Sequence, residues 1–111
     1  MKAIVVEKPG KYSMKEVPDP RIQNPNEVLV EIMAVGICGS DISLLHGGNA
    51  AATYPRIPGH EMTGRIQAVG SAVTKVKAGD RVIVEPIRYC GTCHACKRGR
   101  FNACRYLEVI S

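Results

Sequence analysis

The chain has 111 residues, of which 45% are hydrophobic and 23% are charged, and its formal net charge is +5. This length supplies one globular core and is too small for two domains, and the longest apolar run, residues 28–38, is too short to cross a bilayer. Because the first residues lack the apolar core of a signal peptide and the cysteine count of five is odd, we expect a cytoplasmic chain with no membrane partner.

The N-terminal half has the pattern of short strands separated by polar turns. Residues 2–6 form an apolar strand candidate, and turns rich in Pro and Asn follow within residues 18–26. Residues 27–35 place apolar side chains on both faces in alternation, which predicts a strand buried on both sides. Residues 40–46 indicate a short helix, with Ser40 or Asp41 as its N-cap.

The second half continues this pattern. Residues 62–69 alternate again, and Gly79 and Asp80 lead into a strand over residues 81–85. Several short strands joined by Gly and Pro turns favour a mainly β fold, either a barrel or a sandwich. The sequence contains no internal repeat that would indicate a repeat architecture.

Four cysteines lie within fifteen residues at the spacing C-x2-C-x2-C-x7-C, and they are Cys90, Cys93, Cys96 and Cys104. Two-residue gaps let thiolates converge on one ion, so a tetrahedral four-thiolate zinc site fits best. Two disulfides are an alternative, but C-x-x-C pairs in a chain without a signal peptide argue against them. An iron–sulfur cluster is a second alternative, although the ferredoxin run has three residues before its fourth cysteine and a proline after it.

The segment from Ile87 to Arg105 contains these cysteines and no acidic residue. Its five basic residues are Arg88, Lys97, Arg98, Arg100 and Arg105. Zinc with four thiolates carries a formal charge of about −2, so nearby cations have a local charge to neutralise. Few aromatic side chains are available for base stacking, and we therefore expect no nucleic-acid partner. His94 is expected to be a solvated loop residue because four thiolates already fill a tetrahedron.

A second group of metal-binding residue types lies upstream, in Cys38, His60 and Glu61. A thiolate, an imidazole and a carboxylate bind zinc together, and mixed sites with a free position are usually catalytic. Taken singly, each residue also has an ordinary structural explanation. Cys38 would be a small buried hydrophobe, His60 a loop residue and Glu61 a surface charge.

These two groups in one chain resemble the zinc-dependent medium-chain alcohol and polyol dehydrogenases. Gly59-His60-Glu61 with Gly64 and Gly70 matches the zinc signature of that family, and residues 38–41 and 79–82 match two further motifs. The resemblance implies a GroES-like, partly open β-barrel with a short helix and a four-cysteine zinc lobe. Residues 1–111 would be the N-terminal part of this catalytic domain, and residues 88–106 would be the lobe.

The resemblance also implies two zinc ions per chain. Cys38, His60 and Glu61 would bind a catalytic zinc, with Glu61 as a ligand or an exchanging partner, and the four later cysteines would bind a structural zinc. The catalytic ion lowers the pKa of a bound hydroxyl from about 16 towards ~7, which prepares the alcohol for hydride transfer to NAD or NADP. Ser40 would pass the proton of the alcohol towards solvent, and Asp41 would orient the ring of His60.

The sequence departs from the family pattern in several places. Many relatives carry a relay histidine where this chain has Ser43, so either His46 substitutes for it or the relay ends at Ser40. No G-x-G-x-x-G loop follows a strand, so the Rossmann domain of the family is absent from these residues. The resemblance covers roughly the first third of a family member. We therefore expect these 111 residues alone to be inactive.

Residues 38–41 and 54–61 are most like the branch that oxidises polyols and sugar acids, as sorbitol, threonine, galactonate and gulonate dehydrogenases do. The implied partner is a small alcohol, polyol or sugar acid, and the implied assembly is a homo-oligomer, a dimer or a tetramer. Arg56 either meets a substrate carboxylate or is a surface or interface arginine. Two other functions stay open, which are a non-enzymatic zinc-binding interaction module and a zinc or iron–sulfur nucleic-acid binder.

Overall fold

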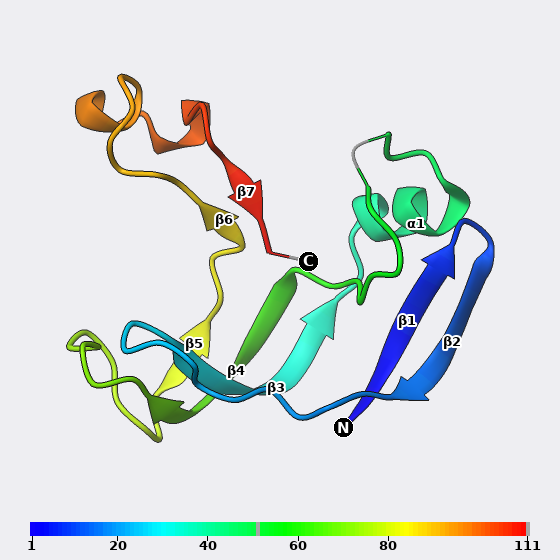
Figure 1. The fold of residues 1–111 in the computed structure, drawn as a ribbon, viewed down its shortest axis with the longest axis horizontal. Helices are drawn as coiled ribbons and strands as arrows, with labels where there is room; N and C mark the ends of the chain where they lie inside the picture. The colour runs from blue at the N-terminus through cyan, green and yellow to red at the C-terminus, as the bar shows by residue number, and fades with distance from the viewer. Residues whose placement is uncertain (51, 111) are drawn as a thin grey trace.

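The computed structural model describes residues 1–50 and 52–110, and its elements are mostly short strands (Figure 1). Two 3-10 turns, η1 and η2, lie in the cysteine-rich segment. In chain order the elements are β1 (Lys2–Lys8), β2 (Lys11–Glu16), β3 (Val28–Gly36), α1 (Gly39–His46), β4 (Glu61–Val69), β5 (Arg81–Ile83), β6 (Ile87–Arg88), η1 (Cys96–Arg98), η2 (Phe101–Ala103) and β7 (Glu108–Val109).

These strands form three separate antiparallel sheets, ordered β1-β2, β3-β4-β5 and β6-β7. The β1-β2 hairpin and α1 lie on one side of the molecule, and the cysteine-rich segment with its flanking strands β6 and β7 lies on the other (Figure 1). The predicted mainly β fold with a short helix is confirmed, and the sheets do not close into a complete barrel. Every strand pair among the described residues is antiparallel, unlike the parallel sheet of a Rossmann fold.

Strand β2 has no counterpart in the sequence predictions. All six of its residues are exposed, and Tyr12 and Met14 are its only apolar side chains, too few to indicate a strand by alternation. Its pairing with β1, from Lys2 opposite Glu16 to Lys8 opposite Lys11, defines it as a strand. Gly10 turns the hairpin with a φ of 74°, a conformation that glycine adopts without strain. Pairing with a neighbour, and not the period of the sequence, therefore creates this strand.

The prediction that the strand at residues 27–35 is buried on both sides is wrong. Strand β3 occupies nearly that range, but Ile32 is 44% exposed, Met33 69% and Val35 50%. Among the described residues β3 pairs only with β4, which leaves its other edge without a strand. The apolar alternation thus predicted the strand correctly, while its burial depends on segments that would cover its faces.

Strand β4 is the best-packed strand of the central sheet. It matches the predicted residues 62–69 with one extra residue at its start, and Gly64 and Ile66 are buried. A Cβ atom at Gly64 would lie 2.3 Å from the carbonyl oxygen of Glu31 on β3, so only glycine allows this close approach. Strand β5 is shorter than the predicted 81–85, although the Val84 N–H still donates to the Met62 carbonyl of β4 at 3.0 Å.

Helix α1 follows β3 after a two-residue gap, close to the predicted residues 40–46. Its N-cap is Cys38, so the expected N-cap at Ser40 or Asp41 is wrong. Asp41 lies at the third helical position, where its carboxylate accepts a hydrogen bond from the Cys38 N–H at 2.8 Å. The helix ends at Gly47, whose φ is 77° and whose N–H bonds to the carbonyl oxygens of the last turn.

The fully packed interior is small. The buried apolar side chains are Val6, Leu44, Ile66, Cys96 and Cys104, whereas many other apolar side chains are exposed. Val6 connects β1 to the segment before β4, because its backbone exchanges two hydrogen bonds with Arg56 at 2.8 and 2.9 Å. No helix among residues 1–50 and 52–110 is long and apolar enough to cross a membrane.

Candidate metal centres

The four sulfur atoms of the lobe cysteines converge within 4.8 Å of one another. Cys90 and Cys93 lie in the loop after β6, Cys96 begins η1, and Cys104 follows η2. Cys96 and Cys104 are buried, and the other two cysteines are half-buried. The closest pair of sulfurs, in Cys90 and Cys104, is 3.6 Å apart, well beyond the length of a disulfide bond. All five cysteines of the chain are free.

Backbone N–H groups point at two of these sulfurs. The Cys93 N–H donates to the Cys90 sulfur, and the Cys90 and Tyr106 N–H groups donate to the Cys104 sulfur, each at 3.3 Å. Such donors stabilise thiolates over thiols. Four sulfurs at this spacing with N–H donors fit the ligand set of a tetrahedral zinc ion. The ligand assignment itself stays a prediction.

The lobe thiols differ in acidity according to their surroundings. Hydrogen bonds from the Thr92 side chain and backbone, and from the backbone of Cys93, lower the pKa of Cys90 to about 6. Burial, with the neighbouring Cys93, raises the pKa of Cys96 to about 12. The four groups would therefore become thiolates together only beside a cation that offsets their mutual repulsion. Sequence inspection missed Thr92, because a threonine between two cysteines carries no metal-site signal.

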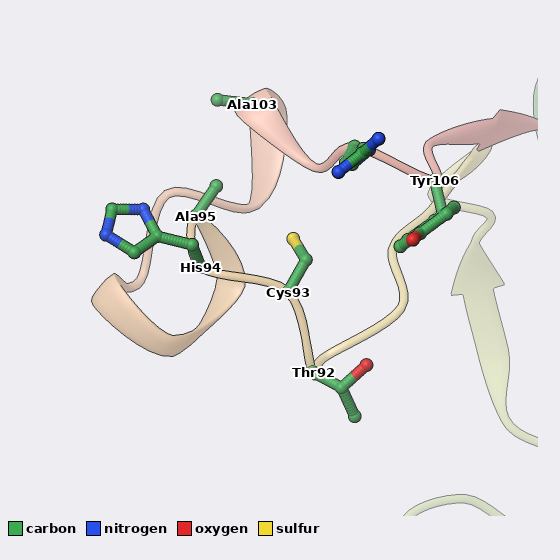
Figure 2. A pocket seen from close by; sticks show the side chains of 7 residues that line it. Thr92, Cys93, His94, Ala95, Ala103 and Tyr106 are labelled. Carbon is green, nitrogen blue, oxygen red and sulfur yellow. The ribbon is translucent and has the colours of Figure 1, made fainter.

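The surroundings of the lobe agree with the expectation for His94. Its side chain is exposed, and Figure 2 shows its ring directed away from Cys93. Two of the basic residues have nearby partners, since Arg88 forms an ion pair with Glu108 of β7 at 3.4 Å and Arg105 lies over the Tyr106 ring. The rings of Tyr89 and Phe101 stack on each other. The ion pair with Glu108 therefore balances part of the positive charge at the edge of the lobe.

The second cluster unites residues from two parts of the central region. The ligand atoms of Cys38, His60 and Glu61 lie within 4.8 Å of one another. Cys38 follows the end of β3, and His60 precedes β4, which begins at Glu61. The antiparallel pairing of β3 with β4 sets Gly36 opposite Glu61, and this register brings the three side chains to one end of the sheet.

Gly36 gives the Glu61 carboxylate its space. A Cβ atom at Gly36 would lie 2.5 Å from Oε2 of Glu61, so the carboxylate occupies the place that any other residue would fill. Cys38 and His60 are half-buried and Glu61 is exposed, so the cluster opens to a broad groove. A glycine two positions before a candidate thiolate was the signal that sequence reasoning overlooked.

Asp41 connects the helix to the imidazole of His60. One oxygen of its buried carboxylate accepts the Cys38 N–H at 2.8 Å, and the other faces Nδ1 of His60 at 3.5 Å. A carboxylate at Nδ1 favours the tautomer that leaves Nε2 free to bind a metal. The Oγ atom of Ser40 lies 3.4 Å from this Nε2. The structure thus brings together all five residues predicted for this site.

Hydrogen bonds also prepare the Cys38 thiol as a ligand. The side chain and backbone of Ser40, and then His60, lower the pKa of Cys38 below its ordinary value, and the charge of Glu61 opposes this effect. Thiolate is the form that binds a metal. His46, the alternative relay residue, is exposed in the last turn of α1, and it does not line the described pocket beside Ser40.

Comparison with known proteins agrees with this geometry. Residues 24–110 match the family model described as "Alcohol dehydrogenase GroES-like domain". The chain is 49% identical to a sorbitol dehydrogenase of Bacillus subtilis over an alignment of 114 positions, which covers 100% of the chain and 32% of that protein. It is 38% identical to the L-galactonate-5-dehydrogenase of Escherichia coli over 112 residues, again 32% of that protein.

Among solved structures, galactitol-1-phosphate dehydrogenase from Escherichia coli superposes with a TM-score of 0.93 at 36% identity. This match covers 99% of the chain and 32% of the solved chain. The chain thus spans about a third of the length of the relatives that it matches. By sequence and by fold, it belongs to the alcohol dehydrogenase GroES-like domain family.

Proposed function

We propose that these residues are the N-terminal part of a zinc-dependent dehydrogenase, which oxidises a secondary alcohol of a polyol or sugar acid with NAD or NADP. The observation that carries this proposal is the convergence of Cys38, His60 and Glu61 within 4.8 Å, although 22 positions (60 minus 38) separate Cys38 from His60. A mixed ligand set with an exposed carboxylate leaves room for a substrate. A closed structural site does not need such a set.

Cys38 and His60 would hold a zinc ion at this site, with Glu61 as a ligand or exchanging partner. Zinc bound there supplies Lewis-acid chemistry that makes the substrate hydroxyl more acidic. Ser40 lies at hydrogen-bonding range of the His60 ring, and its hydroxyl would accept the proton of the alcohol and pass it towards solvent. Asp41 would fix the orientation of the His60 ring through Nδ1 and the position of Cys38 through its N–H.

The lobe would bind a second zinc ion through Cys90, Cys93, Cys96 and Cys104. With four thiolates its coordination is complete, so this ion would stabilise the fold of residues 88–106 and take no part in the reaction. Residues 1–111 would be the N-terminal part of the catalytic domain. The nicotinamide cofactor would bind to a domain outside these residues.

The names of the relatives support the substrate class, since they include dehydrogenases of sorbitol, L-galactonate and galactitol 1-phosphate. All three substrates carry secondary hydroxyl groups. We further propose a cytoplasmic homo-oligomer, a dimer or a tetramer, that binds neither nucleic acid nor membranes.

The test is to purify the full-length protein, count its zinc by elemental analysis and assay hexitols and their acids with NAD and NADP. We expect two zinc ions per chain and reduction of one of the cofactors. Residues 1–111 alone are expected to show no turnover. A full-length protein with one zinc ion and no turnover would instead support a non-enzymatic zinc-binding module, and turnover by residues 1–111 alone would contradict the division proposed here.

A further inference from the structure

Arg56 lies beside the proposed catalytic site and is not a free surface residue. It is half-buried, and it lines a small cavity of about 230 Å³ together with Ser40 and His60. Residues of α1, of the segment between α1 and β4, and of β7 line this partly open cavity. Its other lining residues are Asp41, Leu44, Asn49 and Val109.

The backbone of Arg56 is held firmly. Its N–H and carbonyl groups exchange hydrogen bonds with Val6 of β1 at 2.9 and 2.8 Å, and Val6 is fully buried. Two residues earlier, the Tyr54 hydroxyl donates to the Leu44 carbonyl of α1 at 2.7 Å. A side chain on such a support starts from a fixed position relative to Ser40 and His60, as a binding residue requires.

The guanidinium of Arg56 has no counter-ion in the part of the chain that the structure describes, since none of its ion pairs includes Arg56. Asp41 is the one acidic residue that lines the cavity there, and its two oxygens already face the Cys38 N–H and the His60 ring. Burial of a cation without a partner costs free energy, and an anionic ligand would offset this cost. The planar guanidinium suits carboxylate and phosphate groups because it can bind two of their oxygens at once.

We propose that Arg56 binds an anionic group of the substrate, a carboxylate or a phosphate, and thereby makes the enzyme prefer sugar acids or sugar phosphates to neutral polyols. This inference rests on the proposed function, because Ser40 and His60 mark where the reacting hydroxyl would lie. The phosphates of the nicotinamide cofactor offer the same chemistry. Sharing a cavity with Ser40 and His60 favours the substrate as the source of the anion.

The experiment uses the full-length protein with zinc and cofactor, and substrates that differ only in one terminal group. The matched pairs are sorbitol with L-gulonate and galactitol with L-galactonate, and galactitol 1-phosphate supplies the phosphate. The variants are Arg56→Leu and Arg56→Lys. Arg65→Leu is the control, because Arg65 is an exposed arginine on β4 away from the cavity.

We expect Arg56→Leu to lower kcat/KM for the preferred anionic substrate about 10- to 100-fold, and that for the matched hexitol less than about twofold. Arg56→Lys should keep part of the preference, since lysine retains the charge but not the planar fork. The Kd of the acid measured by calorimetry should rise by the same factor. Arg65→Leu should change none of these values.

Equal losses on acids and hexitols would overturn the inference, as would a rise confined to the KM of the cofactor. A wild-type enzyme that prefers hexitols would also overturn it and leave the proposed dehydrogenase function intact. Absence of turnover with every substrate would contradict the dehydrogenase function. The calorimetric comparison would then still support Arg56 as an anion site if binding is lost in Arg56→Leu, or overturn it if binding is unchanged.

Discussion

The two candidate metal centres of this chain differ in where their ligands come from: one uses a single short segment, and the other uses two segments that are far apart in the sequence. The lobe takes its four sulfurs from residues 90–104, and its own turns supply the N–H groups that bond to them. The mixed centre takes Cys38 from the end of β3 and His60 and Glu61 from the start of β4, and only the pairing of these strands unites them. Two of the four lobe cysteines are buried and two are half-buried, whereas Glu61 of the mixed centre is exposed.

This difference suits the lobe to stabilising the fold and the mixed centre to chemistry on a substrate. A complete set of thiolates leaves no position for a substrate, so its ion acts on the fold. The mixed set is supported by Asp41 and bordered by Ser40, both of which contact the His60 ring. Removing one centre at a time should therefore produce two different kinds of loss, and the predictions below test this in the full-length protein.

Cys38→Ser should have the largest effect on turnover. If Cys38 binds the proposed catalytic zinc, loss of its thiolate would remove the ion that polarises the substrate, so we expect kcat/KM to fall at least about 1000-fold. Elemental analysis should show one zinc ion per chain in place of two, with little change in Tm. If the variant kept two zinc ions and its activity, Cys38 would not be a ligand and the contrast between the centres would fail.

Cys96→Ser should have the largest effect on stability. Cys96 is a buried member of the lobe, and weaker binding of the structural ion removes folding free energy from residues 88–106. We expect Tm to fall by about 10 °C and the zinc content to drop by one. Protein that remains folded at low temperature should keep its KM. An unchanged Tm would mean that the lobe does not depend on its metal.

Ser40→Ala tests the proton route at the mixed centre. Removal of its hydroxyl should lower kcat about 100-fold, with both zinc ions retained, because a positioned proton-transfer group contributes about that much. Ser43→Ala on the same helix is the matched control and should leave kcat unchanged. If the two variants behaved alike, the relay would not pass through Ser40.

Asp41→Asn tests the support behind His60. The amide keeps the shape of the side chain but loses the charge that faces Nδ1, so we expect zinc to bind the mixed centre about tenfold more weakly. A titration against a competing chelator measures this affinity. Asp80→Asn is the control, since the Asp80 carboxylate accepts a hydrogen bond from the Lys77 N–H in a turn, at 3.0 Å. Lobe zinc should be unaffected, and an equal loss from both centres would contradict the assignment.

Treatment with a chelator should show the smallest difference between the two centres, which is a difference in the rate of zinc release. The accessible mixed centre should lose zinc to dipicolinate about tenfold faster than the closed lobe, and activity should decay with the first ion released. Stopped-flow measurement of zinc release beside residual activity checks this order. Release of the lobe zinc first would reverse the comparison.

The sequence predicted some elements well, for local reasons. The alternation over residues 62–69 identified β4, and residues 40–46 nearly match α1. It did not predict β2, whose six exposed residues include only two apolar side chains, and it wrongly predicted that β3 is buried on both sides. It also gave the helix the wrong N-cap, because Asp41 acts at the third helical position through the Cys38 N–H.

The sequence by itself determined the lobe, because the spacing of Cys90, Cys93, Cys96 and Cys104 places four sulfurs within reach of one ion through local turns. It also supplied the residue types of the mixed centre, through a resemblance to a family. Only the tertiary structure decided that Cys38, His60 and Glu61 lie together, that Gly36 makes room for a carboxylate and that Arg56 faces the same cavity as Ser40. Strand register and packing between distant segments set these positions, and no local pattern encodes them.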